Sequence, residues 1–208
     1  MIGPRPLRPA LIWGGLATAM TVPVVIAAGS PLLAWRSSVY IAAGFAGVVA
    51  LALLLIQPLL SGAYLPGLRL RPGRRLHAGV GAGIAAAVTI HVAGLWLTSP
   101  PDVVDALLFN SPTTFSAWGV VAMWAVFASS LLAAFRGRLR LGLIAWRLCH
   151  IIFAVVIVVG SVVHALLIDG TMEIVSKAAL CALVITAAAK VMVDLRLLTD
   201  IRRISSRQ

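Results

Sequence analysis

Histidine is the residue type in this sequence with the clearest capacity for chemistry, and it occurs four times. His77 and His91 are 14 residues apart, and so are His150 and His164. In an α-helix, fourteen steps of about 100° return to within about 40° of the same face, about 21 Å further along the axis. The spacing therefore predicts that each pair projects from one face of its own helix.

The segments that carry these histidines are strongly apolar. Of the 208 residues, 61% are hydrophobic and 11% are charged, and the mean hydropathy is +1.05. Soluble domains are about 45–50% apolar and about 25% charged, so the composition argues against a soluble enzyme, and the same values exclude a disordered chain. Cys149 and Cys181 are too few for a disulfide framework and form no CxxC or CxxCH motif for zinc or covalent haem attachment.

Six apolar stretches are long enough to cross a bilayer, which takes about 20 residues per helix. We predict an all-α integral membrane protein, a six-helix transmembrane bundle that forms a single membrane domain over residues 1–208. The first stretch is longer than the apolar core of a typical signal peptide, so we expect it to be retained as a helix. The predicted spans cover residues 10–29, 38–60, 76–97, 116–135, 146–168 and 174–193, with a short cytoplasmic tail over 194–208.

The basic residues predict the orientation of these spans. The net charge is +11, and the basic residues are concentrated in every second connection between the spans and at the two termini. The remaining connections hold four of the six acidic residues. By the positive-inside rule both termini are cytoplasmic, in a multi-pass protein of a bacterial-type inner membrane. A nucleic-acid partner is not expected, because the basic residues recur between apolar blocks rather than on one face. The residues assigned to the cytoplasmic side are Arg5, Arg8, Arg69, Arg71, Arg74, Arg75, Arg136, Arg138, Arg140, Arg147, Lys190, Arg196, Arg202, Arg203 and Arg207.

This topology brings the histidines into register. The third and fifth spans run in the same direction, so His77 is expected level with His150 near the cytoplasmic end, and His91 level with His164 near the outer end. Ionisable groups inside spans are costly and usually mark function. A lone intramembrane histidine is well explained by an interhelical hydrogen bond, whereas two matched pairs favour two bis-imidazole sites stacked across the membrane.

The surroundings of the histidines favour b-type haem. Imidazole suits zinc, copper, nickel and iron, but no Asp, Glu or Met lies beside these residues and Cys149 accompanies only one of them. We therefore predict His77 and His150 as axial ligands of an inner haem, and His91 and His164 as those of an outer haem. Further candidates for the haem environment are small residues that would let a flat macrocycle approach a helix, and cations that would pair with its propionates. Helix packing explains the small residues equally well, and the positive-inside rule explains the cations. These candidates are Gly79, Gly83, Gly160, Arg74, Arg75 and Arg147.

With these features the sequence resembles the ferric-reductase-like transmembrane family. That family includes eukaryotic ferric reductases, NADPH oxidases and the bacterial haem-binding subunit of the periplasmic methionine sulfoxide reductase system. The matching features are six spans with both ends inside, histidine pairs on the third and fifth spans, and the runs RRLH at 74–77 and WRLCH at 146–150.

The four histidines do not fit all branches of that family equally. His91, His150 and His164 match the histidine positions of the bacterial subunit, whereas His77 stands where that subunit's pattern usually has a nonpolar residue. The resemblance therefore implies a complete inner bis-histidine site, as in the oxidases and ferric reductases, and argues against a role in methionine sulfoxide reduction.

The resemblance also implies the direction of electron flow. Electrons pass from a cytoplasmic flavin through the inner and outer haems to ferric iron, oxygen or a periplasmic redox partner. The sequence has no GxGxxG motif after a strand and no room for a flavin or nicotinamide domain, so we expect a separate cytoplasmic flavoreductase or reduced flavin, FMN or FAD, as donor. No acid, base or nucleophile constellation is present, and the chain is interpreted as an oxidoreductase component whose haems carry the chemistry.

Two alternatives stay open. Cytochromes of the respiratory bc class also place paired histidines about four turns apart on parallel helices, so the chain could be a cytochrome b anchor that exchanges electrons with quinone in a dehydrogenase complex. A cofactor-free carrier or scaffold is the third hypothesis. It is less favoured because the two histidine-bearing spans run parallel, contain no proline and keep their histidines away from the midplane, where a substrate site is expected.

Overall fold

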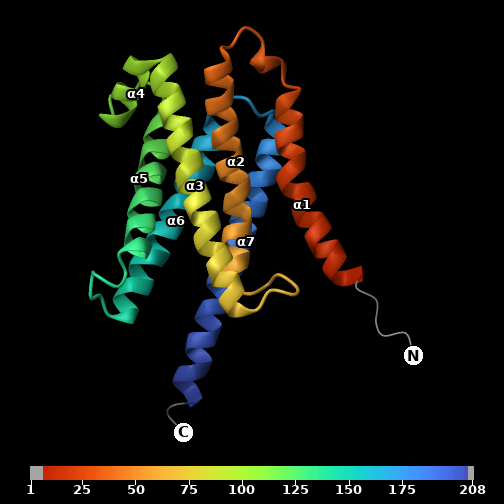
Figure 1. The fold of residues 1–208 in the computed structure, drawn as a ribbon, viewed down its shortest axis with the longest axis vertical. Coiled ribbons are helices and arrows are strands. Elements are labelled where there is room, and N and C mark those ends of the chain that lie inside the picture. The colour runs from red at the N-terminus through yellow and green to blue at the C-terminus, as the bar shows by residue number, and fades with distance from the viewer. Residues whose placement is uncertain (1–6, 206–208) are drawn as a thin grey trace.

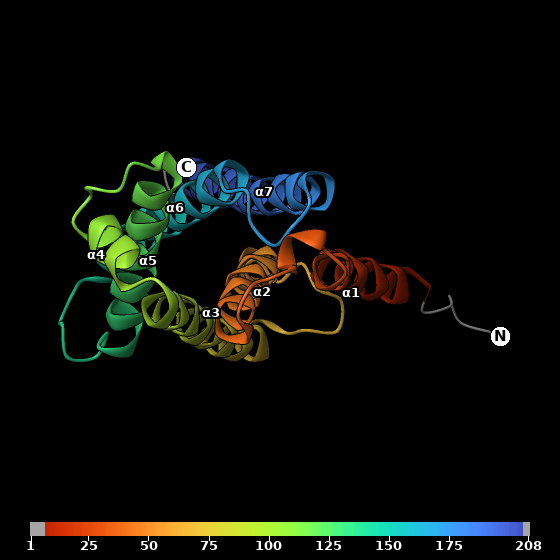
Figure 2. The ribbon, with the colours of Figure 1, turned by 90° about the horizontal axis from the view of Figure 1, so that it is seen from above.

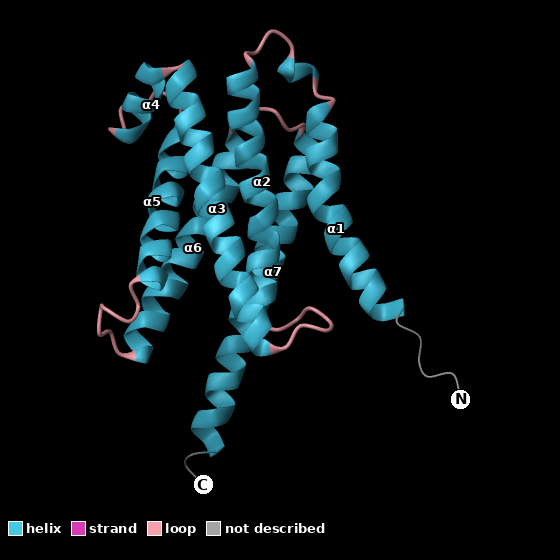
Figure 3. Ribbon diagram, in the orientation of Figure 1, coloured by secondary structure: helices cyan, strands magenta, loops and turns pink. Residues whose placement is uncertain are grey.

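The computed structural model describes the backbone of residues 7–205 and the side chains of residues 7–194. Within that range the secondary structure is helical, without a strand (Figures 1 and 3), and six helices are long and apolar enough to cross a membrane. The predicted all-α fold with six membrane-spanning helices is confirmed. The helices are α1 (Leu7–Ala28), the 3-10 turn η1 (Pro31–Leu33), α2 (Ser38–Ser61), α3 (Leu70–Thr98), α4 (Pro100–Leu107), α5 (Thr114–Ala134), α6 (Leu143–Leu167) and α7 (Ile174–Ser205).

The connections alternate between the two ends of the bundle. Figure 1 shows the start of α1, the α2–α3 loop, the α5–α6 loop and the end of α7 at one end. We call this the arginine-rich end, because its described residues include Arg69, Arg71, Arg74, Arg75, Arg136, Arg138, Arg140 and Arg147. The opposite end, the acidic end, carries α4 and the acids Asp102, Asp105, Asp169 and Glu173. Arg5 and the side chains of Arg196, Arg202, Arg203 and Arg207 lie outside the described residues.

The helices depart most from the prediction at the start of α3, at α4, which was not predicted, and at the end of α7. Helix α3 begins at Leu70 rather than at residue 76, because Pro72 falls in the first turn, where a helix has no use for the missing N–H. Helix α4 follows α3 directly, with Pro100 and Pro101 in its first turn and Asp102 favoured there by the helix dipole. Helix α7 continues beyond the predicted end of the sixth span to Ser205, so the backbone of the predicted tail is helical that far.

The helices are arranged as two facing groups. Seen from above in Figure 2, α1, α2 and α3 form one row, and α5, α6 and α7 form an arc that faces it. Helix α3 packs mainly on α2 and α6 mainly on α5, while α2 also contacts α7. The buried core centres on α2 and α7, where Leu55 is 4% exposed and Val184 is fully buried. Large apolar side chains such as Leu11, Ile90 and Ile144 are exposed on the outward faces, as contact with lipid requires.

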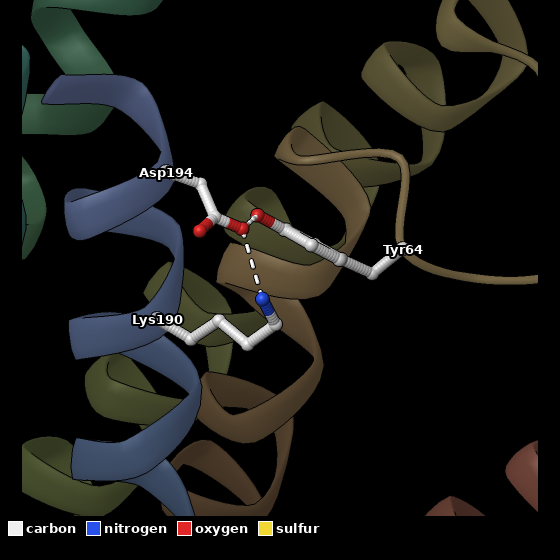
Figure 4. Close-up of polar contacts among 3 residues, drawn as sticks. All are labelled: Tyr64, Lys190 and Asp194. Atoms are coloured by element: carbon white, nitrogen blue, oxygen red, sulfur yellow. Dashed lines mark hydrogen bonds and ion pairs between the residues drawn. The ribbon is translucent and has the colours of Figure 1, made fainter. Parts of the chain in front are cut away.

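A polar cluster ties the α2–α3 loop to α7 near the arginine-rich end (Figure 4). The Tyr64 hydroxyl donates a hydrogen bond to the Asp194 carboxylate, and the ammonium of Lys190 lies 2.9 Å from the same carboxylate oxygen. The Lys190 ammonium also lies 5.0 Å from the centre of the Tyr64 ring. Partial burial and the bond to Asp194 together raise the pKa of Tyr64 to about 12. The tyrosine therefore stays protonated and keeps donating at all physiological pH values.

Candidate functional site

The four histidines meet in two pairs between α3 and α6. The ring centroids of His77 and His150 lie 6.0 Å apart, and those of His91 and His164 lie 6.4 Å apart. Since α3 packs mainly on α2 and α6 mainly on α5, these imidazoles project from two separate helical hairpins toward one another. The structure thus brings together the residues that the 14-residue spacing and the parallel topology predict as partners.

In the outer pair, His91 and His164 are each oriented by a backbone carbonyl of the neighbouring helix. The Nδ1–H of His91 donates to the carbonyl oxygen of Ala43 on α2 at 2.7 Å, and that of His164 donates to the carbonyl oxygen of Phe115 on α5 at 2.8 Å. A carbonyl only accepts, so the proton of each neutral ring is assigned to Nδ1, which leaves the Nε2 lone pair available. Both rings are therefore in the tautomer that binds a metal through Nε2.

Glycines make room for the outer rings. A Cβ atom on Gly119 would lie 2.6 Å from Nδ1 of His164, and one on Gly47 would lie 3.1 Å from Nδ1 of His91. Gly47 lies four residues after Ala43 on α2, and Gly119 lies four residues after Phe115 on α5. Each glycine is therefore one helical turn beyond the residue whose carbonyl accepts the hydrogen bond from the histidine. Sequence reasoning missed both glycines, because nothing local marks them and the carbonyl-glycine arrangement becomes visible only when the two helical hairpins are compared.

The inner pair is oriented by one carbonyl and one hydroxyl. The Nδ1–H of His77 donates to the carbonyl oxygen of Gln57 at 3.0 Å, and Nδ1 of His150 lies 3.1 Å from the Ser129 hydroxyl. The Trp146 ring stacks on His150 at 5.3 Å with an interplanar angle of 6°, and the Arg136 guanidinium lies 4.4 Å from the Trp146 ring centre. His150 is thus held between a hydrogen bond and an aromatic face. Within the described part of the chain, no hydrogen bond engages the Nε2 atom of any of the four histidines.

A cavity of about 480 Å³ lies at the outer pair. His91 and His164 both line it, together with apolar residues of α2, α3, α5 and α6 and with serine and threonine side chains toward the acidic end. Its volume lies within the range of about 300–1,000 Å³ that is usual for small-molecule and cofactor sites. His77 and His150 are not among its lining residues, so the two pairs differ in the space around them.

The donor set of each pair has a definite coordination chemistry. When one metal ion lies between two imidazoles, each metal–nitrogen bond is about 2 Å long and each ring centroid lies about 1 Å beyond its nitrogen. The two ring centroids are then about 6 Å apart. The separations of both pairs agree with that value. Zinc sites take three or four protein ligands, whereas the described residues contain no group of three or more His, Cys, Asp or Glu side chains placed to hold a metal ion. The pairs therefore suit a metal whose remaining ligands come from a non-protein group.

The other predicted environment residues occupy varied positions. A Cβ on Gly79 would meet no atom within 4 Å, and one on Gly83 would make an ordinary contact with a Leu53 methyl group. Gly160 packs against α5, where its Cβ would lie 3.0 Å from that of Ala122, so close helix packing accounts for it. The three predicted arginines are Arg74 and Arg75 on α3 and Arg147 on α6. They are exposed in the first two turns of these helices, at the end where the inner pair lies. No described residue forms an ion pair with them.

Comparison with known proteins identifies one family. The family model described as ferric reductase like transmembrane component matches residues 43–161, more than half of the chain. The matched segment runs from α2 to α6 and includes His77, His91 and His150, whereas His164 lies just beyond its end. No curated protein and no solved structure matches the chain.

Proposed function

Because this chain belongs to the ferric-reductase-like transmembrane component family, we propose that it transfers electrons across a membrane through two b-type haems. His77 and His150 bind the inner haem, and His91 and His164 bind the outer haem. When bound, haem supplies one-electron oxidation and reduction at its iron. The acceptor on the outer side is ferric iron, oxygen or a periplasmic redox partner.

The orientation of the imidazoles is the observation that carries this proposal. Every Nδ1 atom is engaged by a group on α2 or α5, and within each pair the rings lie at a separation that suits one metal between them. Hydrogen bonds of this kind hold a ligand's tautomer and ring angle and raise its basicity. A histidine that served only to join helices would have no reason to meet a second one with both Nε2 atoms free of hydrogen bonds.

The distribution of charge supports an orientation with the arginine-rich end in the cytoplasm. Positively charged residues are retained on the cytoplasmic side of membrane proteins, and all the described arginines except Arg36 lie at the arginine-rich end, where α2 joins α3 and α5 joins α6. This orientation also puts both termini in the cytoplasm. We accordingly assign the protein to a bacterial-type inner membrane, with the inner pair near the cytoplasm and the outer cavity toward the periplasm.

The same charges suit the electron donor that we propose, a separate flavoprotein or a reduced flavin. Arg74, Arg75 and Arg147 are exposed beside the helix starts that carry His77 and His150. An exposed cationic surface attracts acidic proteins and phosphate-bearing cofactors and raises their association rate. The chain thereby supplies an attractive surface for the donor at the end where electrons enter.

Spectroscopy of the purified protein tests the proposal. The reduced-minus-oxidised spectrum, together with the ratio of haem to protein, should show two low-spin haems with two histidine ligands each. The matched variant for the inner site is His77→Leu, which should lose half of the haem and leave the outer signal unchanged. Protein that carries no Soret band after expression with excess haem precursor would end the proposal.

A further inference from the structure

Lys177 is a buried cation that the proposed electron path does not use. It lies at the end of the first turn of α7, near the acidic end, and it is only 4% exposed. Its ammonium donates one hydrogen bond, to the carbonyl oxygen of Ile168 at 2.7 Å. An ammonium group has three N–H donors, so within the described residues two of them have no acceptor. Burial of a charge in this state is costly unless an anion accompanies it.

No described carboxylate forms an ion pair with the Lys177 ammonium. Both carboxylate oxygens of Glu173 accept hydrogen bonds from the first turn of α7, one from the N–H of Val175 and one from the N–H of Ser176. These bonds also lower the pKa of Glu173. Among the residues with described side chains, the single ion pair joins Lys190 to Asp194, at the opposite end of α7. Lys177 therefore has no described carboxylate at ion-pair distance, although the charge of Glu173 acts on it from further away and Asp102 lines the same cavity.

The position of Lys177 relates it to the outer histidine pair. Its side chain lines the same cavity as His91 and His164, and no other lysine or arginine among the described residues does so. The carbonyl that it contacts belongs to Ile168, whose own N–H donates to the carbonyl oxygen of His164 at 3.2 Å. The ammonium is thus attached to the turn of α6 that carries an outer ligand.

We propose that Lys177 is the counter-ion for a carboxylate of the molecule held between His91 and His164. This inference rests on the proposed function, because the molecule in question is an iron porphyrin with two propionates. A carboxylate can accept the two free N–H donors of Lys177 and neutralise its charge, while the Ile168 carbonyl retains the third. Lys177 is then a specificity-determining residue, since it would favour a porphyrin that carries free carboxylates over one that does not.

Porphyrin titrations separate this role from a purely structural one. In a His77→Leu/His150→Leu background, which leaves only the outer pair, apo-protein in detergent is titrated with iron protoporphyrin IX and with its dimethyl ester. We expect Lys177→Met to weaken binding of the free acid by about 10- to 100-fold, the usual range for a hydrogen bond to a charged group. Binding of the ester should be unchanged, and Lys177→Arg should retain most of the affinity for the free acid.

The ester also reports whether the variant folds. Lys190→Met is the matched control, because it removes an exposed cation from the same helix and should leave both affinities unaltered. An equal loss of affinity for acid and ester in Lys177→Met, or no loss for either, would overturn the inference. Failure of the proposed function is distinguishable, because the chain with all four histidines would then bind neither porphyrin.

Discussion

The imidazole of His164 lies so close to Gly119 that a single added methyl group would collide with it, at 2.6 Å from Nδ1. The contact joins α6 to α5 beside the carbonyl of Phe115 that orients the same ring. Space and orientation for the His164 imidazole are thus provided by two residues one turn apart on the neighbouring helix. This relationship leads directly to the first prediction.

Gly119→Ala should remove the outer haem and leave the inner one. The new methyl group has no room beside His164, and overpacking of this kind costs about 1–3 kcal/mol. Half of the haem absorbance should be lost, and the remaining signal should be that of the inner site. Gly79→Ala is the control, since a Cβ there meets no atom within 4 Å. Retention of both haems by Gly119→Ala would show that the His164 ring stands elsewhere when haem is bound.

His91→Ala and His164→Ala should each abolish the outer haem while His77→Ala abolishes the inner one. The two pairs are separated by 14 residues along α3 and along α6, about 21 Å of helix, so the loss of one histidine should not empty the other site. Redox titration of each variant should therefore fit a single midpoint potential. The assignment of ligands is wrong if a variant in one pair empties both sites.

Ser129→Ala should weaken the inner haem selectively. Three of the four histidine Nδ1 atoms bond to backbone carbonyls, whereas Nδ1 of His150 bonds to the side chain of Ser129. This hydrogen bond can therefore be deleted by a substitution that leaves the backbone unchanged. Loss of such a partner usually reduces metal affinity by about 10- to 100-fold. Haem retention during dilution in detergent measures the effect. Ser130→Ala, one residue further along α5, serves as the control and should behave like the parent protein.

Tyr64→Phe should destabilise the protein at neutral pH but not at high pH. The pKa of Tyr64 is raised to about 12 in the folded state, against about 10 in an unfolded chain. A raised pKa stabilises the fold fully below pH 10, and this contribution fades as the pH rises through 12. The loss of the hydrogen bond to Asp194 should cost about 0.5–1.5 kcal/mol, toward the lower end because the cluster is partly exposed.

Thermal unfolding in detergent at several pH values checks this expectation. The difference in melting temperature between the parent and Tyr64→Phe should be constant up to pH 10 and shrink above it. Tyr40→Phe is the matched control, because no described residue forms a hydrogen bond with the Tyr40 hydroxyl. A difference that grows with pH would contradict the role assigned to the Tyr64 hydroxyl.

Reduced FMN should reduce the haems faster than a water-soluble quinol, and added salt should slow the reaction. The exposed arginines near the inner pair attract the flavin phosphate, and salt screens that attraction. Stopped-flow absorbance measures the rates, with Arg75→Gln expected to be several-fold slower and Arg36→Gln, at the opposite end, unchanged. Faster reduction by the quinol, insensitive to the arginines, would favour the cytochrome b alternative.

The pairing of the histidines was predictable because helical periodicity is a local property. Residues 14 apart share a face of any α-helix, and the alternation of spans makes the two histidine-bearing helices parallel. The six spans could be predicted for the same reason, since the length and polarity of each segment are contained in the segment itself. The start of α3 could not, because Pro72 is compatible both with a break and with a first helical turn.

The amino-acid sequence by itself thus determined that six apolar helices cross the membrane and that four histidines occupy two levels, since both follow from short-range pattern and from exclusion of charge by lipid. Only the tertiary structure decided which groups orient those histidines. Gly47, Gly119 and Ser129 lie on other helices from the rings that they contact, and Lys177, which reads as an ordinary cation near a loop, is buried beside the outer cavity. Such contacts depend on how two hairpins pack across the bundle, and no local pattern in either hairpin contains that information.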